Sequence, residues 1–527
     1  MGDSSMKAIQ MFIVIIALGG LMGIQNKATA AQALDPNIYL PDKGMVMNWE
    51  IDETAPKRPK PILLNPTKYD LKWKLENSLP LNLVQDQQGV LYFSDFRDKV
   101  NAVYPNGEIK WSVKLDAELT VTYLLIGKDD TLYAYSKLDN EDTIIYAIAE
   151  NGTIKWKKQS KDIISRYNNQ FAGDSEGNLI VFTTDGLVSY NSSGEANWLN
   201  KTVSSTNIAY ILPQTIHTDN NSNIYVDTDN QEIISIDKEG KLRWKTSNAN
   251  FLDGKTFFKP YFSAKGLIYS VTPSGLHMIE SDTGTMIEPD KLDFADIQSS
   301  GLPSDGKGGF YLDNSGNVAK MDHLGEVKWQ YKTRDTEKYG LGLLDGVVSD
   351  KDGNVYFTGG VGNIYGLNSE GQEFFVLLRN AFWYKSVELV IGKNNNIYAI
   401  NNDIGLTSFG KKQIQIFINN LSLPMSLEPI NNKGTVLVPF RDLFEGLGLK
   451  VEWDQETKLI TGSKEGLTIQ FKIGDKFALV NGVQTALSNP PELRNGNTFV
   501  PLRFISEATG SSVKWNGKNS SINIEQK

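Results

Sequence analysis

The chain alternates short apolar stretches with turns rich in glycine and polar residues, and one such phrase recurs eight times. The phrase is a turn followed by a short apolar strand that contains an aromatic residue, a tyrosine in seven copies, with Ile180 at the same position in the third copy. Successive copies lie between 41 and 47 residues apart. A period of about 44 residues with several short strands per repeat is typical of a β-propeller blade, so the pattern predicts eight blades. The residues at the matching position of the eight copies are Tyr92, Tyr133, Ile180, Tyr225, Tyr269, Tyr311, Tyr356 and Tyr398.

A second phrase, a glycine turn followed by a strand that ends in tryptophan, alternates with the first. Two of its slots lack the tryptophan, one around Ile287 and one at Phe374. Asn-Gly and similar pairs supply the positive-φ residues that tight hairpins need. A tryptophan at a strand end can pack against the next blade and bury a large apolar area, so we expect these residues to be structural blade-joint residues. They are Trp73, Trp111, Trp156, Trp198, Trp244 and Trp329.

The repeats resemble the PQQ-like family of eight-bladed propellers over residues 67–412. The resemblance is informative about the fold and says little about function, because propellers host many activities. The segment around Trp73 matches the outer strand that ends a blade, yet no blade precedes it. The last repeat, after Asn401, lacks a well-marked outer strand of its own. We therefore expect the strand near 69–75 to complete the last blade and close the ring.

The C-terminal part of the chain is a duplication. Residues 438–454 and 500–516 align at an offset of 62, with seven identities in 17 positions. Each copy predicts a strand, a short helix opened by proline and ended by glycine, and a strand that carries a tryptophan. An Arg and a Glu four residues apart share one helix face in each copy. The matching residues include Arg441, Glu445 and Trp453 in the first copy, and Arg503, Glu507 and Trp515 in the second.

This duplicated unit, residues 413–527, resembles the copper amine oxidase N-terminal-like domain, also called the stalk domain. The resemblance implies a protruding spacer or adhesion module, common in exported proteins of Gram-positive bacteria. It implies no copper or quinone, because in the enzymes that gave the name this domain is an appendage. We expect Trp453 and Trp515 to occupy equivalent buried positions. The predicted fold class is thus mainly β: an eight-bladed β-propeller followed by a small duplicated α+β domain.

The N-terminal segment predicts export. Residues 11–22 form an apolar run of about a dozen residues after Lys7, the length of a signal-peptide core. The sequence Ala28-Thr29-Ala30 predicts cleavage before Ala31, although an uncleaved anchor is the alternative. Residues 1–30 are therefore expected to be a signal peptide, and residues 31–66, with six prolines, an extended linker. We expect an extracellular or cell-envelope location and no membrane span after cleavage.

Composition narrows the chemistry. The chain has no cysteine, which excludes disulfides, thiolate nucleophiles and cysteine-bound metals. The formal net charge is -9, and residues 1–30 and 413–527 carry +1 each, so the middle section carries -11. Because phosphate binding needs a basic surface, this acidity disfavours nucleic acid as a partner.

Candidate catalytic and cofactor residues are sparse. The three histidines, His217, His277 and His323, lie 46 to 60 residues apart in different repeats, which does not suggest a copper triad. The vicinal disulfide usual in PQQ enzymes cannot form. The stretch from Asp350 to Asn354 is only faintly similar to a calcium loop, and a hairpin turn is the better interpretation. We therefore expect no catalytic residue, no metal site and no cofactor.

Two tryptophans, Trp49 and Trp383, fall outside both phrases and are candidates for exposed ligand contacts, with ordinary packing as the alternative. Two functions stay open at this point. The first is a binding or scaffolding protein of the cell surface, with a protein or a cell-wall glycan as its partner. The second is an extracellular enzyme, glycan-active or quinone-dependent, with an active site in the propeller funnel. Converging carboxylates, or a histidine beside a carboxylate, in the funnel would favour the enzyme.

Overall fold

The computed structural model of the chain describes most of the sequence from residue 62 onward. Among the described residues no helix is long and apolar enough to cross a membrane. The described ranges are 62–64, 69–75, 80–95, 99–115, 123–127, 129–138, 142–163, 171–203, 216–227, 232–247, 261–262, 266–272, 275–287, 310–314, 317–321, 327–333, 347–359, 362–378, 387–401, 405–494 and 496–527.

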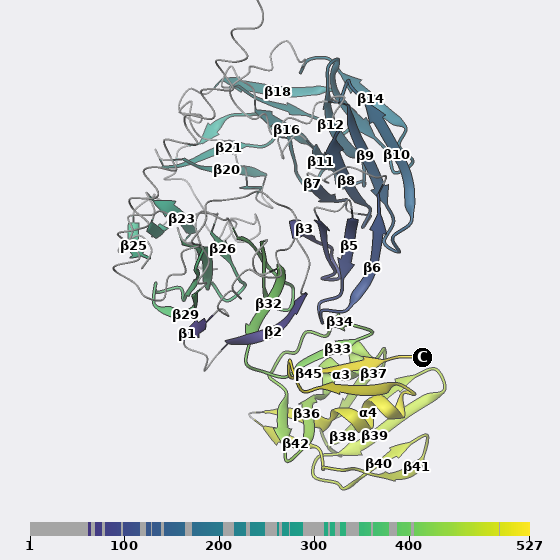
Figure 1. Cartoon of the computed structure of the whole chain (residues 1–527). Helices are drawn as coiled ribbons and strands as arrows, with labels where there is room; N and C mark the ends of the chain where they lie inside the picture. Colours follow the sequence, from purple (N-terminus) through teal and green to yellow (C-terminus); the bar gives the residue numbers. More distant parts are fainter. Residues whose placement is uncertain are drawn as a thin grey trace, which may run out of the picture.

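The described strands between residues 62 and 411 form eight antiparallel sheets, the blades of a propeller (Figure 1). Blade 1 consists of β3 (Pro80–Gln85), β4 (Leu91–Asp95), β5 (Lys99–Val103) and β6 (Ile109–Lys114). Blade 2 consists of β7 (Tyr123–Ile126), β8 (Leu132–Lys137), β9 (Thr143–Ile148) and β10 (Ile154–Ser160). Blade 3 consists of β11 (Phe171–Gly173), β12 (Leu179–Thr183), β13 (Gly186–Tyr190) and β14 (Ala196–Asn200). Blade 4 consists of β15 (Ile216–Thr218), β16 (Ile224–Asp227), β17 (Glu232–Ile236) and β18 (Leu242–Ser247).

The second half of the ring repeats this plan. Blade 5 consists of β19 (Tyr261–Phe262), β20 (Leu267–Thr272), β21 (Gly275–Glu280) and β22 (Met286–Ile287). In blade 6 the described strands are β23 (Phe310–Asn314), β24 (Asn317–Met321) and β25 (Val327–Lys332). Blade 7 contains β26 (Val348–Ser349), β27 (Val355–Thr358), β28 (Ile364–Leu367) and β29 (Glu373–Leu378). Blade 8 contains β30 (Glu388–Ile391), β31 (Ile397–Asn401) and β32 (Gly405–Lys411).

Two N-terminal strands join blades from the other end of the chain. Strand β2 (Tyr69–Leu75) pairs antiparallel with β32 and is the outermost strand of blade 8, with Trp73 opposite Ser408. The ring is therefore closed by its N-terminal strand, as the sequence predicts. Strand β1 (Ile62–Leu64) pairs with β29 as a fifth strand of blade 7. The expectation of a linker over 31–66 does not hold for the residues of β1, because they add to a sheet.

The propeller core lies between the blades rather than inside one sheet. In β4, Tyr92 belongs to an apolar cluster with Leu132 of the second blade, while Leu91 belongs to another with Tyr398 of the eighth. Consecutive residues of a strand point to opposite faces, so a strand buried on both faces needs an unbroken apolar run. The repeated phrase supplies that run, which explains why it reads as continuously apolar rather than alternating.

The C-terminal domain contains three sheets and two short helices. Its first half contains β33 (Gln415–Ile418), β34 (Leu421–Ser422), β35 (Ile430–Asn432), β36 (Thr435–Pro439), α3 (Phe440–Gly446), β37 (Lys450–Asp454) and β38 (Leu459–Lys464). Strand β39 (Leu467–Lys472) follows. The second half contains β40 (Phe477–Val480), β41 (Val483–Ala486), β42 (Glu492–Arg494), β43 (Asn497–Pro501), α4 (Leu502–Ala508), β44 (Ser512–Asn516) and β45 (Ser521–Glu525).

The offset of 62 holds for the starts of all these paired elements, from β33 and β40 to β38 and β45. The two halves meet at β36 and β43, which pair antiparallel with Val438 directly opposite its counterpart Val500. This register places an internal pseudo-twofold axis between the two valines. Both valines belong to one apolar core shared by the two halves, together with residues of α3 and α4. The duplication therefore folds as a single unit rather than as two domains.

Candidate functional site

The repeated tryptophans lie at the joints between successive blades. Each indole N–H donates a hydrogen bond to a backbone carbonyl in the glycine turn of the next blade. The distances are 2.9 Å from Trp73 to Pro105, 2.7 Å from Trp111 to Glu150, 2.9 Å from Trp156 to Ser192, 2.8 Å from Trp198 to Lys238, 2.8 Å from Trp244 to Ser281 and 3.1 Å from Trp329 to Ser369. The joint from Trp73 to Pro105 links blade 8 to blade 1 and so spans the closure of the ring.

A glycine with positive φ lies against each indole. A Cβ atom added to Gly107 would stand 2.7 Å from Cγ of Trp73, which is closer than real Cβ atoms approach. The other five joints repeat the contact. The glycine therefore has two roles, since it adopts the positive φ of the turn and leaves room for the indole to pack flat against the backbone. The pairs are Trp73 with Gly107, Trp111 with Gly152, Trp156 with Gly194, Trp198 with Gly240, Trp244 with Gly284, and Trp329 with Gly371.

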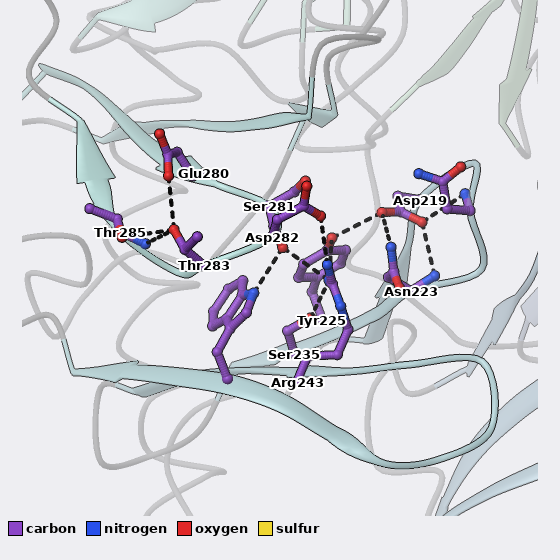
Figure 2. A network of polar contacts seen from close by, with 12 residues as sticks. Asp219, Asn223, Tyr225, Ser235, Arg243, Glu280, Ser281, Asp282, Thr283 and Thr285 are labelled. Carbon is purple, nitrogen blue, oxygen red and sulfur yellow. Dashed lines mark hydrogen bonds and ion pairs between the residues drawn. The ribbon is translucent and has the colours of Figure 1, made fainter.

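Figure 2 shows the polar network at the joint between blades 4 and 5. The Tyr225 hydroxyl donates to the Asp219 carboxylate at 2.9 Å and accepts from Arg243 at 3.3 Å. The Arg243 guanidinium also donates to the Ser281 carbonyl and, at 2.8 Å, to the Asp282 carboxylate of the next blade. Burial raises the pKa of Tyr225, with the Asp219 charge adding to the shift. The Arg243 guanidinium therefore links blade 4 to blade 5 through Ser281 and Asp282.

The turn at Asp350 is filled by hydrogen-bond donors. One carboxylate oxygen accepts the backbone N–H groups of Asp352, at 2.9 Å, and Asn354, at 3.0 Å. The other accepts the Asn354 side-chain amide at 2.9 Å and the Tyr356 hydroxyl at 3.0 Å. A carboxylate that accepts four hydrogen bonds is arranged as an acceptor for protein N–H and O–H groups rather than for a cation. The structure therefore supports the hairpin-turn interpretation of this stretch.

The first strands of blades 8, 1 and 2 are neighbours, since β3 contacts both β30 and β7. The Glu388 carboxylate of blade 8 accepts the backbone N–H of Leu83 in blade 1 at 3.3 Å. The pKa of Tyr123 in blade 2 is raised by burial and secondarily by the Glu388 charge. His217 lies on β15 of blade 4 and is half-buried. No group of three or more His, Asp or Glu side chains suited to a metal occurs among the described residues.

The first half of the C-terminal domain docks against the closure between blades 8 and 1. The Gln415 side chain donates to Asn396 of blade 8 at 2.7 Å in a buried contact. The Asn420 side-chain oxygen accepts from Asn106 of blade 1 at 2.8 Å. Leu421 packs on the apolar cluster of blades 1 and 2. Figure 1 shows the β33–β34 hairpin beside the lower end of blade 1. Sequence reasoning missed this interface. Gln415, Asn420 and Leu421 belong to no repeated phrase, and the turn positions of Asn106 and Asn396 recur in other blades.

The structure places Trp453 and Trp515 in equivalent positions, but the expectation that they are buried is wrong. Trp453 pairs with Ile460 and Trp515 with Ile522, each in the matching register of an edge strand. The exposed fractions of the two tryptophans are 39% and 49%. Both isoleucines are buried in the core of the domain, whereas neither tryptophan belongs to that apolar cluster. Each indole therefore leaves a large part of its surface accessible to solvent.

The predicted Arg–Glu pairs of the two helices lie on the surface, and several other candidate residues lie outside the described part of the chain. Arg441 and Glu445 form an ion pair at 3.4 Å, and both side chains are exposed. Arg503 and Glu507, also described and exposed, make no such pair. Trp49, Trp383 and His323 lie outside the described residues, and His277 is described only as part of β21. Among the described residues, the exposed pair Trp453 and Trp515, which the sequence predicts to be structural, becomes the candidate ligand surface.

Two family models match the chain. Residues 185–413 match the model described as outer membrane protein assembly factor BamB, and residues 417–524 match the copper amine oxidase N-terminal domain. Both families are non-catalytic. A protease inhibitor of Brevibacillus choshinensis is 33% identical over 113 residues, which are 21% of this chain and 34% of the relative. The chain thus spans about a third of that relative's length.

Solved propeller structures show low sequence identity. BamB from Moraxella catarrhalis is 15% identical with a TM-score of 0.44, covering 66% of this chain and 100% of that chain. Virginiamycin B lyase from Staphylococcus aureus is 12% identical with a TM-score of 0.36, covering 65% and 99%. The chain is thus a β-propeller protein with BamB-like, PQQ-like repeats over residues 185–413 and a copper amine oxidase N-terminal-like domain over residues 417–524.

Proposed function

We propose that this chain is an exported, non-catalytic binding protein of the cell envelope. The propeller is a rigid platform, and the C-terminal domain presents Trp453 and Trp515 to an envelope partner, a protein or a cell-wall glycan. Export rests on the predicted signal peptide with cleavage before Ala31, and the cysteine-free composition is compatible with it.

The observation that carries the proposal is the exposure of the same large aromatic side chain at both copies of one position. A tryptophan in water leaves apolar surface unburied at a cost of roughly 25 cal/mol per Å², so a position with no contact role would favour a smaller or polar residue. Tryptophan is also enriched where proteins bind partners, because its ring offers a large rigid face with a polar N–H. Here it occurs once in each half of the domain, on the equivalent edge strands β37 and β44.

The neighbours of the two rings are polar and differ in charge. Glu452 and Asp454 flank Trp453, whereas Lys514 and Asn516 flank Trp515. A flat aromatic face beside hydrogen-bonding groups suits a ligand that combines apolar patches with hydroxyl or amide groups, as glycans and peptides do. The opposite charges on the two strands further favour a ligand of mixed rather than uniform charge.

The blade residues support a platform rather than a reaction centre. The recurring tryptophans, glycines and the Asp219 and Asp350 carboxylates hold blades together or close turns. The Glu388 carboxylate near the axis accepts a backbone N–H, which fits a structural role as well. The docking of Gln415 and Asn420 on the ring closure fixes the base of the C-terminal domain on the propeller, so the tryptophans are held on a firm support.

A binding assay with cell-wall fractions tests the proposal. The chain without residues 1–30 is compared with the double variant Trp453→Ala/Trp515→Ala and with Ile109→Ala, which removes an exposed apolar side chain of blade 1. We expect the cell-wall fraction to retain at least tenfold less of the double variant than of the parent. Trp453→Ala or Trp515→Ala alone should reduce the retained amount less, and Ile109→Ala should be retained like the parent. Equal retention of the double variant and the parent would refute the role of the tryptophans. Turnover of a sugar, alcohol or amine by the parent would refute the non-catalytic assignment.

A further inference from the structure

The second half of the C-terminal domain contains the counterpart of the surface with which the first half docks on the propeller. In the first half, Phe417 points away from the core of the domain, yet only 1% of it is exposed. Its neighbours Gln415 and Leu421 contact the blades. The counterparts at the offset of 62 are Phe477, Leu479 and Val483, whose exposed fractions are 49%, 39% and 67%.

The two surfaces share their backbone geometry. Both are two-residue hairpins with positive φ at each turn position, 49° and 69° at Asn419 and Asn420, and 50° and 80° at Asn481 and Gly482. They differ in their side chains. The polar anchors Gln415 and Asn420 are replaced by Phe477 and Gly482, so the second surface lacks the groups that bind Asn396 and Asn106. A second propeller site of the same kind is therefore not its partner.

Strand β41 forms the outer edge of this surface. It is the last strand of the sheet ordered β37-β38-β39-β40-β41, and its four residues, Val483 to Ala486, are all exposed. Proteins commonly protect such edges with lysine, proline or other charges, because free N–H and C=O groups recruit further strands. The edge strands β37 and β44 of the same domain carry charged residues. Among its described edge strands of four or more residues, β41 alone has neither a charge nor a proline.

The free hydrogen-bonding groups of β41 can be assigned from the hairpin. In a two-residue hairpin the closing pair, here Val480 and Val483, is hydrogen-bonded, and bonded and non-bonded pairs alternate along the ladder. The pair of Leu479 with Gln484 is then a non-bonded one. The N–H and C=O groups of Gln484 and Ala486 therefore point outward, away from β40.

We propose that β41 pairs antiparallel with β41 of a second copy of this chain, forming a twofold dimer through the C-terminal domain. A strand that meets its own copy antiparallel makes an isologous contact, in which each Gln484 offers the same donor and acceptor to the partner. The short strand carries no charge, so the pairing brings no like charges together. Phe477 and Leu479 of both copies then lie on one face of a continuous sheet.

Charge and position favour a second copy at this surface. The C-terminal domain carries a formal charge of only +1, whereas the middle section of the chain carries -11. In Figure 1 the β40–β41 hairpin lies on the side of the domain away from the propeller. Two chains joined there keep their acidic propellers apart, and over distances beyond about 10 Å their repulsion is largely screened at physiological salt.

The mass of the chain without residues 1–30, measured by light scattering over a range of concentrations, tests the proposal. We expect the mass to rise with concentration from that of one chain to that of two chains. Gln484→Lys sets two lysines close together across the dyad, and Gln484→Pro removes the outward N–H, so both should give monomers. The matched control, Leu493→Lys, places the same charge on an exposed side chain of the edge strand β42 and should leave the dimer intact. A monomer at every concentration, or a dimer that Gln484→Lys and Gln484→Pro leave intact, would overturn the proposal.

Cross-linking provides a second measurement that does not depend on destabilising a variant. Since the chain has no cysteine, a single introduced one reports its own neighbours only. With a short bis-maleimide, Gln484→Cys should give covalent dimers and Leu493→Cys should not. Equal cross-linking at both positions, or cross-linking at Leu493→Cys alone, would place the interface elsewhere. A stable complex of the monomer with a different protein at β41 would likewise contradict pairing between copies.

Discussion

Trp73 and Gly107 are in van der Waals contact across the closure of the ring, where an added Cβ at Gly107 would stand only 2.7 Å from Cγ of the indole. The tryptophan belongs to the N-terminal strand that completes blade 8, and the glycine belongs to a turn of blade 1. The indole N–H also donates to the Pro105 carbonyl at 2.9 Å. This joint therefore has the same geometry as those inside the ring, although one of its partners comes from the far end of the repeat.

Gly107→Ala should loosen the ring closure. The substitution combines a side chain at φ of 93° with an overlap against Trp73, and either effect alone costs about 1 kcal/mol or more. We expect a loss of about 2–4 kcal/mol in the free energy of unfolding, measured by urea denaturation. Gly434→Ala is the matched control, since Gly434 has φ of 90° and nothing within 4 Å of the added Cβ. Gly434→Ala should lower the free energy of unfolding by only about 1–2 kcal/mol, because it has the positive-φ penalty without the overlap. Equal losses would mean that the Trp73 contact contributes nothing.

Trp453→Ala and Trp515→Ala should affect stability modestly. Because the two indoles are partly in water, their removal exposes less new surface and leaves no closed cavity, so we expect about 1–2 kcal/mol each. Trp244→Ala removes an indole that is only 8% exposed and should cost about 3–5 kcal/mol. Thermal or urea unfolding of the three variants gives the comparison. A loss at Trp453 as large as that at Trp244 would indicate that the indole is covered in solution.

Sequence reasoning was most successful where a residue repeats with the period of the fold. The closing strand, the eight blades and the duplicated C-terminal unit are all recognisable from spacing, since each repeat must bury the same surfaces as its neighbours. The two slots without tryptophan, around Ile287 and at Phe374, retain their strands, β22 and β29. At the second of them the Phe374 ring lies 5.4 Å from the ring of Tyr69.

Reasoning from spacing failed where the fold brings unrelated segments together. The offset of 62 predicts that Trp453 and Trp515 are equivalent. Their exposure depends on the tertiary packing of the domain, which no local pattern encodes. The contact of Gln415 with Asn396 joins a glutamine outside the repeats to an asparagine whose turn position recurs in other blades, so spacing does not single it out. The strand β1 joins blade 7 from within a proline-rich segment, and its partner β29 belongs to a distant part of the chain, so no local signal marks that pairing either.

Asp350→Ala should destabilise blade 7 without any link to calcium. The carboxylate accepts two backbone N–H groups, the Asn354 amide and the Tyr356 hydroxyl, so its removal takes the acceptor from the buried Tyr356 hydroxyl and from three part-buried donors. We expect a loss of about 2–4 kcal/mol, because each unsatisfied buried group costs about 1–3 kcal/mol and water can reach part of the turn. Addition of calcium or of a chelator should leave the melting temperature of the parent unchanged. A calcium-dependent rise would show that the turn binds the ion.

Gln415→Leu should release the C-terminal domain from the propeller. The substitution removes the 2.7 Å hydrogen bond to Asn396 and leaves that buried amide oxygen without its donor from the docked domain. We expect faster cleavage between residues 411 and 415 under limited proteolysis, with the two products otherwise intact. Gln470→Leu changes the same residue type on β39, away from the interface, and should leave the cleavage rate unchanged. If both variants are cut like the parent, the interface does not depend on this bond.

The closing strand should make the stability of the protein fall at alkaline pH, because it carries the buried Tyr69. Burial raises the pKa of Tyr69 from 10.0 to about 12, and Tyr69 donates its hydroxyl hydrogen to Tyr356, whose own hydroxyl donates to Asp350. In the unfolded chain the hydroxyl ionises near pH 10. Between pH 10 and 12 the folded state therefore binds more protons, and the stability falls as the pH rises.

The raised pKa of Tyr69 contributes on the order of 2–3 kcal/mol to the free energy of unfolding. This contribution is fully present below pH 10 and is lost as the pH rises to 12. Tyr69→Phe cannot ionise, so it should show a shallower fall in stability over this window, by about one proton. At pH 7 the same variant should be less stable than the parent by about 1 kcal/mol, because it lacks the hydrogen bond to Tyr356. The two curves should therefore converge and cross above pH 10, as measured by urea denaturation at each pH. Parallel curves from pH 8 to 12 would show that Tyr69 titrates normally and that its hydroxyl is not held in the closed ring.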